Sequence, residues 1–105
     1  EKIETIESIS AKKLEKIITD ISLIDVRACG ERSKASLKSS ISMPLNNIDS
    51  KLDSLNKSSK QYIHCAGGYR SMIACSILKK EGFGSVVDVA GGFSAIINDT
   101  NLSIT

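Results

Sequence analysis

The sequence predicts an α/β fold in which a parallel β-sheet is covered by helices on both faces. Strand-like and helix-like segments alternate along the 105 residues, which is the pattern of α/β proteins. The strand-like segments are short and continuously apolar, as in Leu23-Ile24 and Val86-Val87, which is typical of strands buried on both faces. In such folds ligands bind beyond the carboxyl ends of the strands, so we expect the functional site at that edge.

Five segments are expected to form the strands. The first has alternating polarity, the second and fifth are apolar, the third is brief and ends before Pro44, and the fourth leads into a glycine-containing loop. Their predicted bounds are Thr5–Ile9, Ser22–Val26, Ser40–Ser42, Lys60–Cys65 and Val86–Ala90.

Five helices are expected between and after these strands. Ser10 is a plausible N-cap for the first, Leu52 lies at helical spacing in the third, and Gly82 closes the fourth. Their predicted bounds are Ala11–Thr19, Gly30–Leu37, Asn47–Asn56, Ser71–Glu81 and Gly92–Asn98.

Composition indicates one globular domain over residues 1–105, and the first residue, Glu1, suggests a piece excised from a larger protein. The net charge of +2 is interspersed, which argues against nucleic-acid or membrane partners. Three cysteines argue against a disulfide framework and lack the spacing of a zinc site, so we expect no metal and a reducing cytoplasmic location.

The segment His64–Ser71 carries the chemistry. Cys65 follows a strand, Gly67 and Gly68 let successive backbone N–H groups converge, and Ser71 opens a helix whose positive end faces the same point. These features, with the positive charge of Arg70, favour the thiolate form of Cys65, which is the nucleophile.

Ser71, Tyr69 and His64, in or next to this loop, could each have a structural role instead of a chemical one. Ser71 is expected to act as an N-cap and possible donor to the Cys65 sulfur, and Tyr69 to lie at the rim of the pocket. Side chains of adjacent strand residues point to opposite faces, so His64 is expected to be a buried structural residue that cannot readily reach the sulfur.

The pattern Cys65-Ala66-Gly67-Gly68-Tyr69-Arg70-Ser71 resembles the active loop of the rhodanese (sulfurtransferase) family. Similar family elements occur in order along the chain: Leu23–Arg27 with Gly30-Glu31, Ile41–Leu45, Glu81–Phe83, Val86–Val89 and Ala90–Phe93. The resemblance implies a three-layer α/β/α rhodanese-like fold with a five-stranded parallel sheet. The loop looks most like rhodanese domains fused to metallo-β-lactamase-fold proteins, which implies such a partner domain in the parent protein.

One segment departs from the family pattern. Ser36 and Ser39, within Ala35–Ser40, replace a histidine and a glycine that many members carry. This departure predicts altered tuning near the site, while the thiolate loop itself is unchanged.

The resemblance implies that Cys65 carries sulfur as a persulfide from thiosulfate or another persulfide to cyanide or a thiol acceptor, with no cofactor. Residues 66–71 would bind the transferred sulfur. Four residues separate Cys65 from Arg70, one fewer than in tyrosine-phosphatase-type loops, so the ring suits an anion smaller than phosphate. Alternatives are a non-catalytic regulatory or interaction module and, less favoured, a thiol phosphatase or arsenate reductase. Cys29 is a candidate resolving or rim cysteine, and Cys75 is expected in the core.

Overall fold

A sheet of five parallel strands forms the centre of the computed structural model, which describes residues 6–105. Its strands are β1 (Glu7–Ile9), β2 (Ser22–Asp25), β3 (Ser40–Ser42), β4 (Gln61–His64) and β5 (Val86–Val89). They lie in the order β1-β5-β4-β2-β3. The prediction of a parallel five-stranded sheet is confirmed; only the start of the first predicted strand, Thr5, falls outside the described residues.

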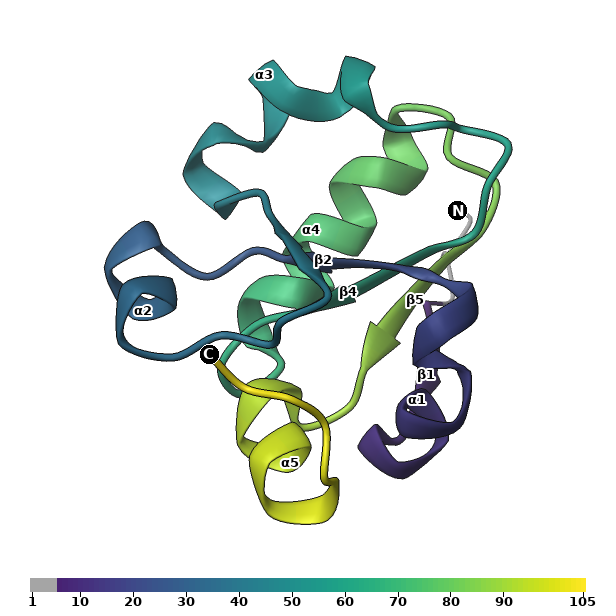
Figure 1. The fold of residues 1–105 in the computed structure, drawn as a ribbon. Helices are drawn as coiled ribbons and strands as arrows, with labels where there is room; N and C mark the ends of the chain where they lie inside the picture. Colours follow the sequence, from purple (N-terminus) through teal and green to yellow (C-terminus); the bar gives the residue numbers. More distant parts are fainter. Residues whose placement is uncertain (1–5) are drawn as a thin grey trace.

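Helices cover both faces of this sheet, which confirms the three-layer α/β/α arrangement (Figure 1). Helices α1 (Ala11–Ile17) and α5 (Gly92–Asp99) pack together on one face. Helix α4 (Tyr69–Lys80) and the short α3 (Ile48–Lys51) lie on the other. Helix α2 (Cys29–Lys34) follows β2 and lies beyond its carboxyl end.

Each face of the sheet has its own apolar core because side chains alternate along each strand. Leu14 of α1 and Ile96 of α5 pack over Leu23 and Val87 on one face. Leu78 of α4 packs over Ile24, with Ile63 beside it, on the other. Burial on both faces explains why β2, β4 and β5 read as apolar runs in the sequence.

All five predicted helices have somewhat different bounds in the structure, by one residue at the end of α5 and by two at the end of α1, which continues as a 3₁₀ turn over Ile18–Asp20. The segment Asn47–Asn56 is not one helix: 3₁₀ turns at Leu45–Asn47 and Leu52–Ser54 flank the single turn of α3. Helix α4 begins at Tyr69, two residues earlier than expected. Helix α2 ends at Lys34 because the chain after it is extended.

That extended segment pairs with the C-terminal residues of the chain. The Ser36 amide donates to the Thr105 carbonyl at 3.1 Å, and the Thr105 amide donates back to Ser36 at 2.9 Å. An antiparallel bridge joins Leu37 to Ile104. The segment that departs from the family pattern is therefore held by backbone pairing, with the Ser36 side chain buried.

Within residues 6–105, no helix has both the length and the apolar character that crossing a bilayer requires.

Candidate active site

Three strands end at the same edge of the sheet and bring the candidate residues together. Strand β4 is central, with β2 and β5 on either side, and all three run in the same direction. Cys65 follows the last residue of β4 and is 1% exposed. The active loop, residues 65–71, thus begins beyond the carboxyl end of a central strand, as the sequence predicted.

The loop curls back over the Cys65 sulfur before it enters α4. Gly68 is the N-cap of α4 and has φ of +111°, a left-handed conformation that glycine adopts without strain. Its amide donates to Sγ of Cys65 at 3.0 Å. A buried sulfur with a backbone donor this close is positioned to carry negative charge.

The loop also lowers the pKa of Cys65. Burial alone would raise the pKa of this thiol, but hydrogen bonds from the Ser71 hydroxyl and from the amides of Ser71, Gly68 and Gly67 outweigh burial. The pKa of Cys65 therefore lies below its usual range. The amides at the start of α4 and the Ser71 hydroxyl therefore favour the thiolate form of Cys65.

Arg70, which is predicted to place a positive charge at the thiolate loop, forms an ion pair with Glu31 of α2. Its guanidinium donates to both carboxylate oxygens of Glu31, at 2.6 and 2.9 Å. Glu31 also accepts from the Ala28 amide at 2.9 Å, and its pKa falls to about 2 chiefly because of the Arg70 hydrogen bonds. Sequence reasoning noted Glu31 but gave it no role; its signal was an acidic residue in the first turn of the expected α2.

Ser71 is not the N-cap of α4, because the helix starts two residues earlier. It lies in the first turn, and its hydroxyl donates to the Gly68 carbonyl at 3.1 Å. The distance from Sγ of Cys65 to Oγ of Ser71 is 3.5 Å. Ser71 also forms a hydrogen bond with the Asp88 carboxyl, a contact that sequence reasoning missed although Asp88 is the one charged residue in β5.

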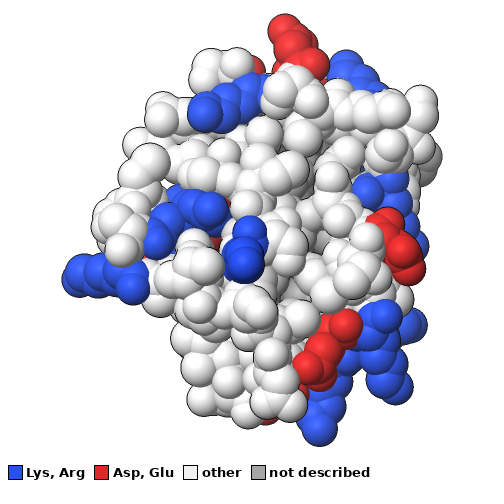
Figure 2. Space-filling model, viewed as in Figure 1, with Lys and Arg blue, Asp and Glu red and all other residues white. Residues whose placement is uncertain are grey.

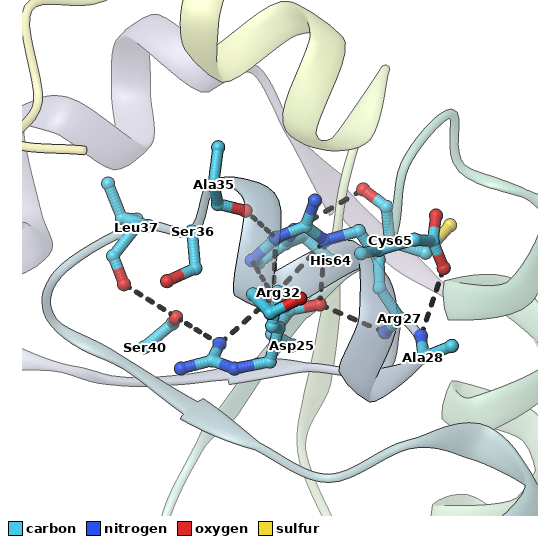
Figure 3. A network of polar contacts seen from close by, with 12 residues as sticks. Asp25, Arg27, Ala28, Arg32, Ala35, Ser36, Leu37, Ser40, His64 and Cys65 are labelled. Carbon is cyan, nitrogen blue, oxygen red and sulfur yellow. Dashed lines mark hydrogen bonds and ion pairs between the residues drawn. The ribbon is translucent and has the colours of Figure 1, made fainter. Parts of the chain in front are cut away.

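An ionic network lies beneath the loop at the end of β2 (Figure 3). Asp25 accepts from Arg27 Nη2 at 2.9 Å and from Arg32 Nη1 at 3.0 Å, and Arg27 is 4% exposed. Burial raises the pKa of Asp25, but the Arg27 hydrogen bonds outweigh it and lower that pKa. The expectation that Asp25 and Arg27 form a structural ion pair is confirmed.

His64 is fully buried between this network and the loop. Its Nδ1 lies 3.3 Å from the Cys65 carbonyl oxygen, and its Nε2 lies 3.9 Å from Oδ2 of Asp25. Burial lowers the pKa of His64, so the ring stays neutral at pH 7. The ring contacts the backbone of Cys65 and supports the loop from below, as the structural interpretation expected.

In the described part of the chain, the remaining candidate residues form no hydrogen bond with the Cys65 sulfur. Tyr69 is 79% exposed at the start of α4, and Ala66 is half-buried. Cys29 is exposed in the first turn of α2, whereas Cys75 is fully buried in the core, as expected. Burial raises the pKa of Cys75 to about 12, so that thiol is not reactive.

A pocket of about 300 Å³ adjoins the loop. Arg70 lines it from the loop, and the residues after β2 and β3 line the rest: Val26, Ala28, Leu45 and Asn46. On the face drawn in Figure 2, basic side chains gather over the region that α2 occupies in Figure 1, with little acidic surface beside them. Among residues 6–105, no three His, Cys, Asp or Glu side chains are grouped so as to hold a metal ion.

Comparison with known proteins agrees with this geometry. The sequence profile of the rhodanese-like domain matches residues 10–99. The chain belongs to the rhodanese-like domain family. The crystal structure of a rhodanese-like domain protein from Staphylococcus aureus is 30% identical, with a TM-score of 0.84 over 95% of this chain and 99% of that one.

Two curated relatives of this rhodanese-like domain have names that refer to sulfur transfer. A sulfurtransferase of Allochromatium vinosum is 29% identical over 72% of this chain and 71% of its own length. A Bacillus subtilis protein named as a candidate sulfur carrier, YrkF, is 34% identical over 69% of this chain. The match covers only 39% of that longer relative.

Proposed function

We propose that this rhodanese-like domain is a sulfurtransferase that carries sulfane sulfur as a persulfide on Cys65. The observation that carries the proposal is the buried Cys65 sulfur, which accepts from the Gly68 amide at 3.0 Å inside a loop with four residues between Cys65 and Arg70. The curated relatives named for sulfur transfer support the same chemistry.

The reaction has two steps. The Cys65 thiolate attacks the outer sulfur of a donor such as thiosulfate, so that a bond forms from Sγ to that sulfur while the bond to the departing sulfite breaks. An acceptor, either cyanide or a thiolate, then attacks the outer sulfur and releases the Cys65 thiolate. The lowered pKa of Cys65 favours both steps, because the thiolate is the nucleophile in the first and the leaving group in the second.

The amides of residues 66–71 would hold the outer sulfur, and the adjoining pocket would hold the rest of the donor or acceptor. Val26, Ala28 and Leu45 give this pocket apolar walls, while Asn46 and Arg70 supply donors. Tyr69 would contact the acceptor from the rim, since its ring is exposed. No organic cofactor or metal is required, because the sulfur itself is the transferred group.

The cellular compartment and the partner domain are expectations that follow from the sequence. Three free cysteines fit a reducing compartment such as the cytoplasm. A metallo-β-lactamase-fold partner domain would exchange persulfide with Cys65. That idea requires faster sulfur turnover by the joined domains than by the separate ones.

Intact-mass spectrometry after incubation with thiosulfate tests the proposal. The native chain should gain one sulfur atom, Cys65→Ser should gain none, and cyanide should discharge the native adduct. Cys29→Ser is the matched control and should load as the native chain does. If it loads but forms no internal disulfide on ageing, whereas the native chain does, Cys29 is a resolving cysteine. A native chain that takes up no sulfur from thiosulfate or glutathione persulfide would favour the non-catalytic module.

A further inference from the structure

Asp88 is a buried carboxyl that the proposed reaction does not yet use. It lies in β5 on the face that α4 covers and is 5% exposed. Its Oδ1 forms a hydrogen bond with Oγ of Ser71. Within residues 6–105, no Lys, Arg or His side chain forms an ion pair with it. A buried carboxylate without a cation is costly, so this position calls for an explanation.

Ser71 lies between the Asp88 carboxyl and the Cys65 thiol, and this position explains the buried carboxyl. The Ser71 hydroxyl has a single proton, yet Oγ lies within reach of three acceptors: the Gly68 carbonyl at 3.1 Å, the Asp88 carboxyl, and Sγ of Cys65 at 3.5 Å. If Asp88 were ionised, it would hold that proton and leave the thiolate without it. A neutral Asp88 instead donates to Ser71, which frees the Ser71 proton for Sγ.

The surroundings of Asp88 favour the neutral carboxyl. Burial raises the pKa of Asp88, and the hydrogen bond with Ser71 only partly offsets this. Cys75 faces it from α4 and stays a neutral thiol, while Lys79 lies one turn further along that helix. The register partners of Asp88 on the two neighbouring strands are Ser8 and Ile63, neither of which carries a charge.

We propose that Asp88 is a positioning residue: as a neutral carboxylic acid it donates to Oγ of Ser71 and so directs the Ser71 hydroxyl proton to the Cys65 thiolate. Asp88 keeps its own proton, and the proton that Cys65 loses on activation leaves to solvent. The thiolate is then the one charged group among these three side chains, with Ser71 and Asp88 both neutral. This role depends on Cys65 being the reactive thiol, as the proposed function requires.

The carbon-13 NMR spectrum of Asp-labelled wild-type protein tests the protonation state directly. We expect one carboxyl carbon, assigned to Asp88, to have the chemical shift of a neutral acid at pH 7. An Asp88 carboxyl that is fully ionised at pH 7 while Cys65 reacts as a thiolate would overturn the proposal. This measurement needs no variant, so it stands even if substitutions at Asp88 impair folding.

Alkylation of Cys65 by iodoacetamide, followed by mass spectrometry of its peptide in a Cys29→Ser background, tests the connection through Ser71. Ser71→Ala should slow alkylation at pH 6 by at least about tenfold, because a rise of one unit in the pKa of Cys65 lowers the thiolate fraction tenfold. Asp88→Asn should stay within about threefold of the parent, because the amide donates to Ser71 as the neutral acid does. Asp53→Asn, an exposed control, should change nothing.

A folded Asp88→Asn variant whose Cys65 profile moves to higher pH as far as that of Ser71→Ala would contradict the donor role. Alkylation does not involve sulfur transfer, so its outcome is independent of persulfide loading. A chain that shows the Ser71 and Asp88 effects but never loads sulfur would overturn the proposed function and leave this inference intact.

Discussion

At the scale of single residues, the positive charge of the active loop is balanced by an ion pair between Arg70 and Glu31. Arg70 is the only cation of the loop, and both of its hydrogen bonds to Glu31 direct it toward α2. The pair has no net charge, so stabilisation of the thiolate falls mainly to the amides and to Ser71. Glu31 thereby sets where the guanidinium lies beside the adjoining pocket.

Glu31→Gln should slow persulfide formation from thiosulfate. Without the carboxylate, Arg70 loses its fixed orientation beside the pocket, and misplacement of a positioning group costs up to about a hundredfold in rate. We expect a decrease of about ten- to a hundredfold, measured by mass spectrometry of the persulfide over time. Glu81→Gln, which removes the same charge at the far end of α4, should load normally. Equal rates in the two variants would show that Arg70 needs no anchor.

The same pair predicts a pH window for stability. The pKa of Glu31 falls from 4.5 to about 2 on folding, so the ion pair contributes fully above pH 4.5 and its contribution is lost as pH falls toward 2. Both side chains are about one-third exposed, so the contribution is modest. Denaturant unfolding of wild type and Glu31→Gln should therefore differ by a constant amount near neutral pH and converge near pH 2. A difference that grows on acidification would contradict this assignment.

The sequence points to Cys65 and its loop as the candidate site because the pattern of cysteine, glycines, arginine and serine is contiguous. It missed the partners of that loop, Glu31 and Asp88, because they lie far along the chain and only the sheet brings them near. It also placed the start of α4 too late, because Gly68 caps the helix through its left-handed backbone and not through a side chain that a sequence pattern can reveal.

At the scale of elements, two helices hold the active loop, one from each face of the sheet. Helix α4 leaves the loop, while the start of α5 packs against its first residues. The Phe93 amide donates to the Cys65 carbonyl at 2.6 Å, and the Ser94 amide donates to the Ala66 carbonyl at 3.1 Å. Gly92 has φ of +58°, and a Cβ there would lie 2.3 Å from the Cys65 carbonyl oxygen.

Gly92→Ala should lower the free energy of unfolding and impair Cys65. The left-handed conformation alone costs a residue with a Cβ about 1–3 kcal/mol, and the contact with backbone atoms of the loop adds to this. Denaturant unfolding and Cys65 alkylation measure the two effects. Gly30→Ala, in α2 where a Cβ meets nothing within 4 Å, is the matched control and should be neutral or stabilising. A Gly92→Ala chain as stable and as reactive as wild type would show that α5 does not fix the loop.

Most elements follow from local patterns, and the exceptions have physical causes. Ser10 accepts from the Lys13 amide and caps α1 as expected. The segment 47–56 has apolar residues at helical spacing, but the structure divides it into short turns whose buried residues, Ile48 and Leu52, pack onto the core over α4. Tertiary packing can satisfy that pattern without a continuous helix, and the sequence does not distinguish the two.

At the scale of the whole molecule, the Asp25 network connects segments that no single helix or strand joins. Asp25 of β2 binds Arg27 beyond the strand and Arg32 of α2. Arg27 also donates to the Ala35 carbonyl at 2.9 Å and lies over the Phe93 ring of α5, 4.0 Å from its centroid. The network therefore links β2, α2 and α5 beneath the active loop.

Asp25→Ala should be among the most destabilising single substitutions in this chain. Removing one partner of a buried pair leaves Arg27 without its counter-ion, which costs about 3–5 kcal/mol. Glu7→Ala removes a carboxylate from the exposed pair with Lys60, whose atoms lie 3.4 Å apart, and should cost less than about 1 kcal/mol. Urea unfolding of both variants measures the contrast. Equal losses would mean that the buried network contributes no more than a surface pair.

The parallel sheet has a consequence for how the protein is made. The ribosome delivers the chain in order, so Cys65 emerges before Asp88. It also emerges before the Gly92–Ser94 turn, in which an amide donates to the Cys65 carbonyl. A nascent chain that ends at Glu81 has the cysteine but lacks the strand and helix that complete its surroundings. The activated thiolate is therefore a product of the finished domain, and the growing chain exposes only an ordinary thiol to the oxidants around it.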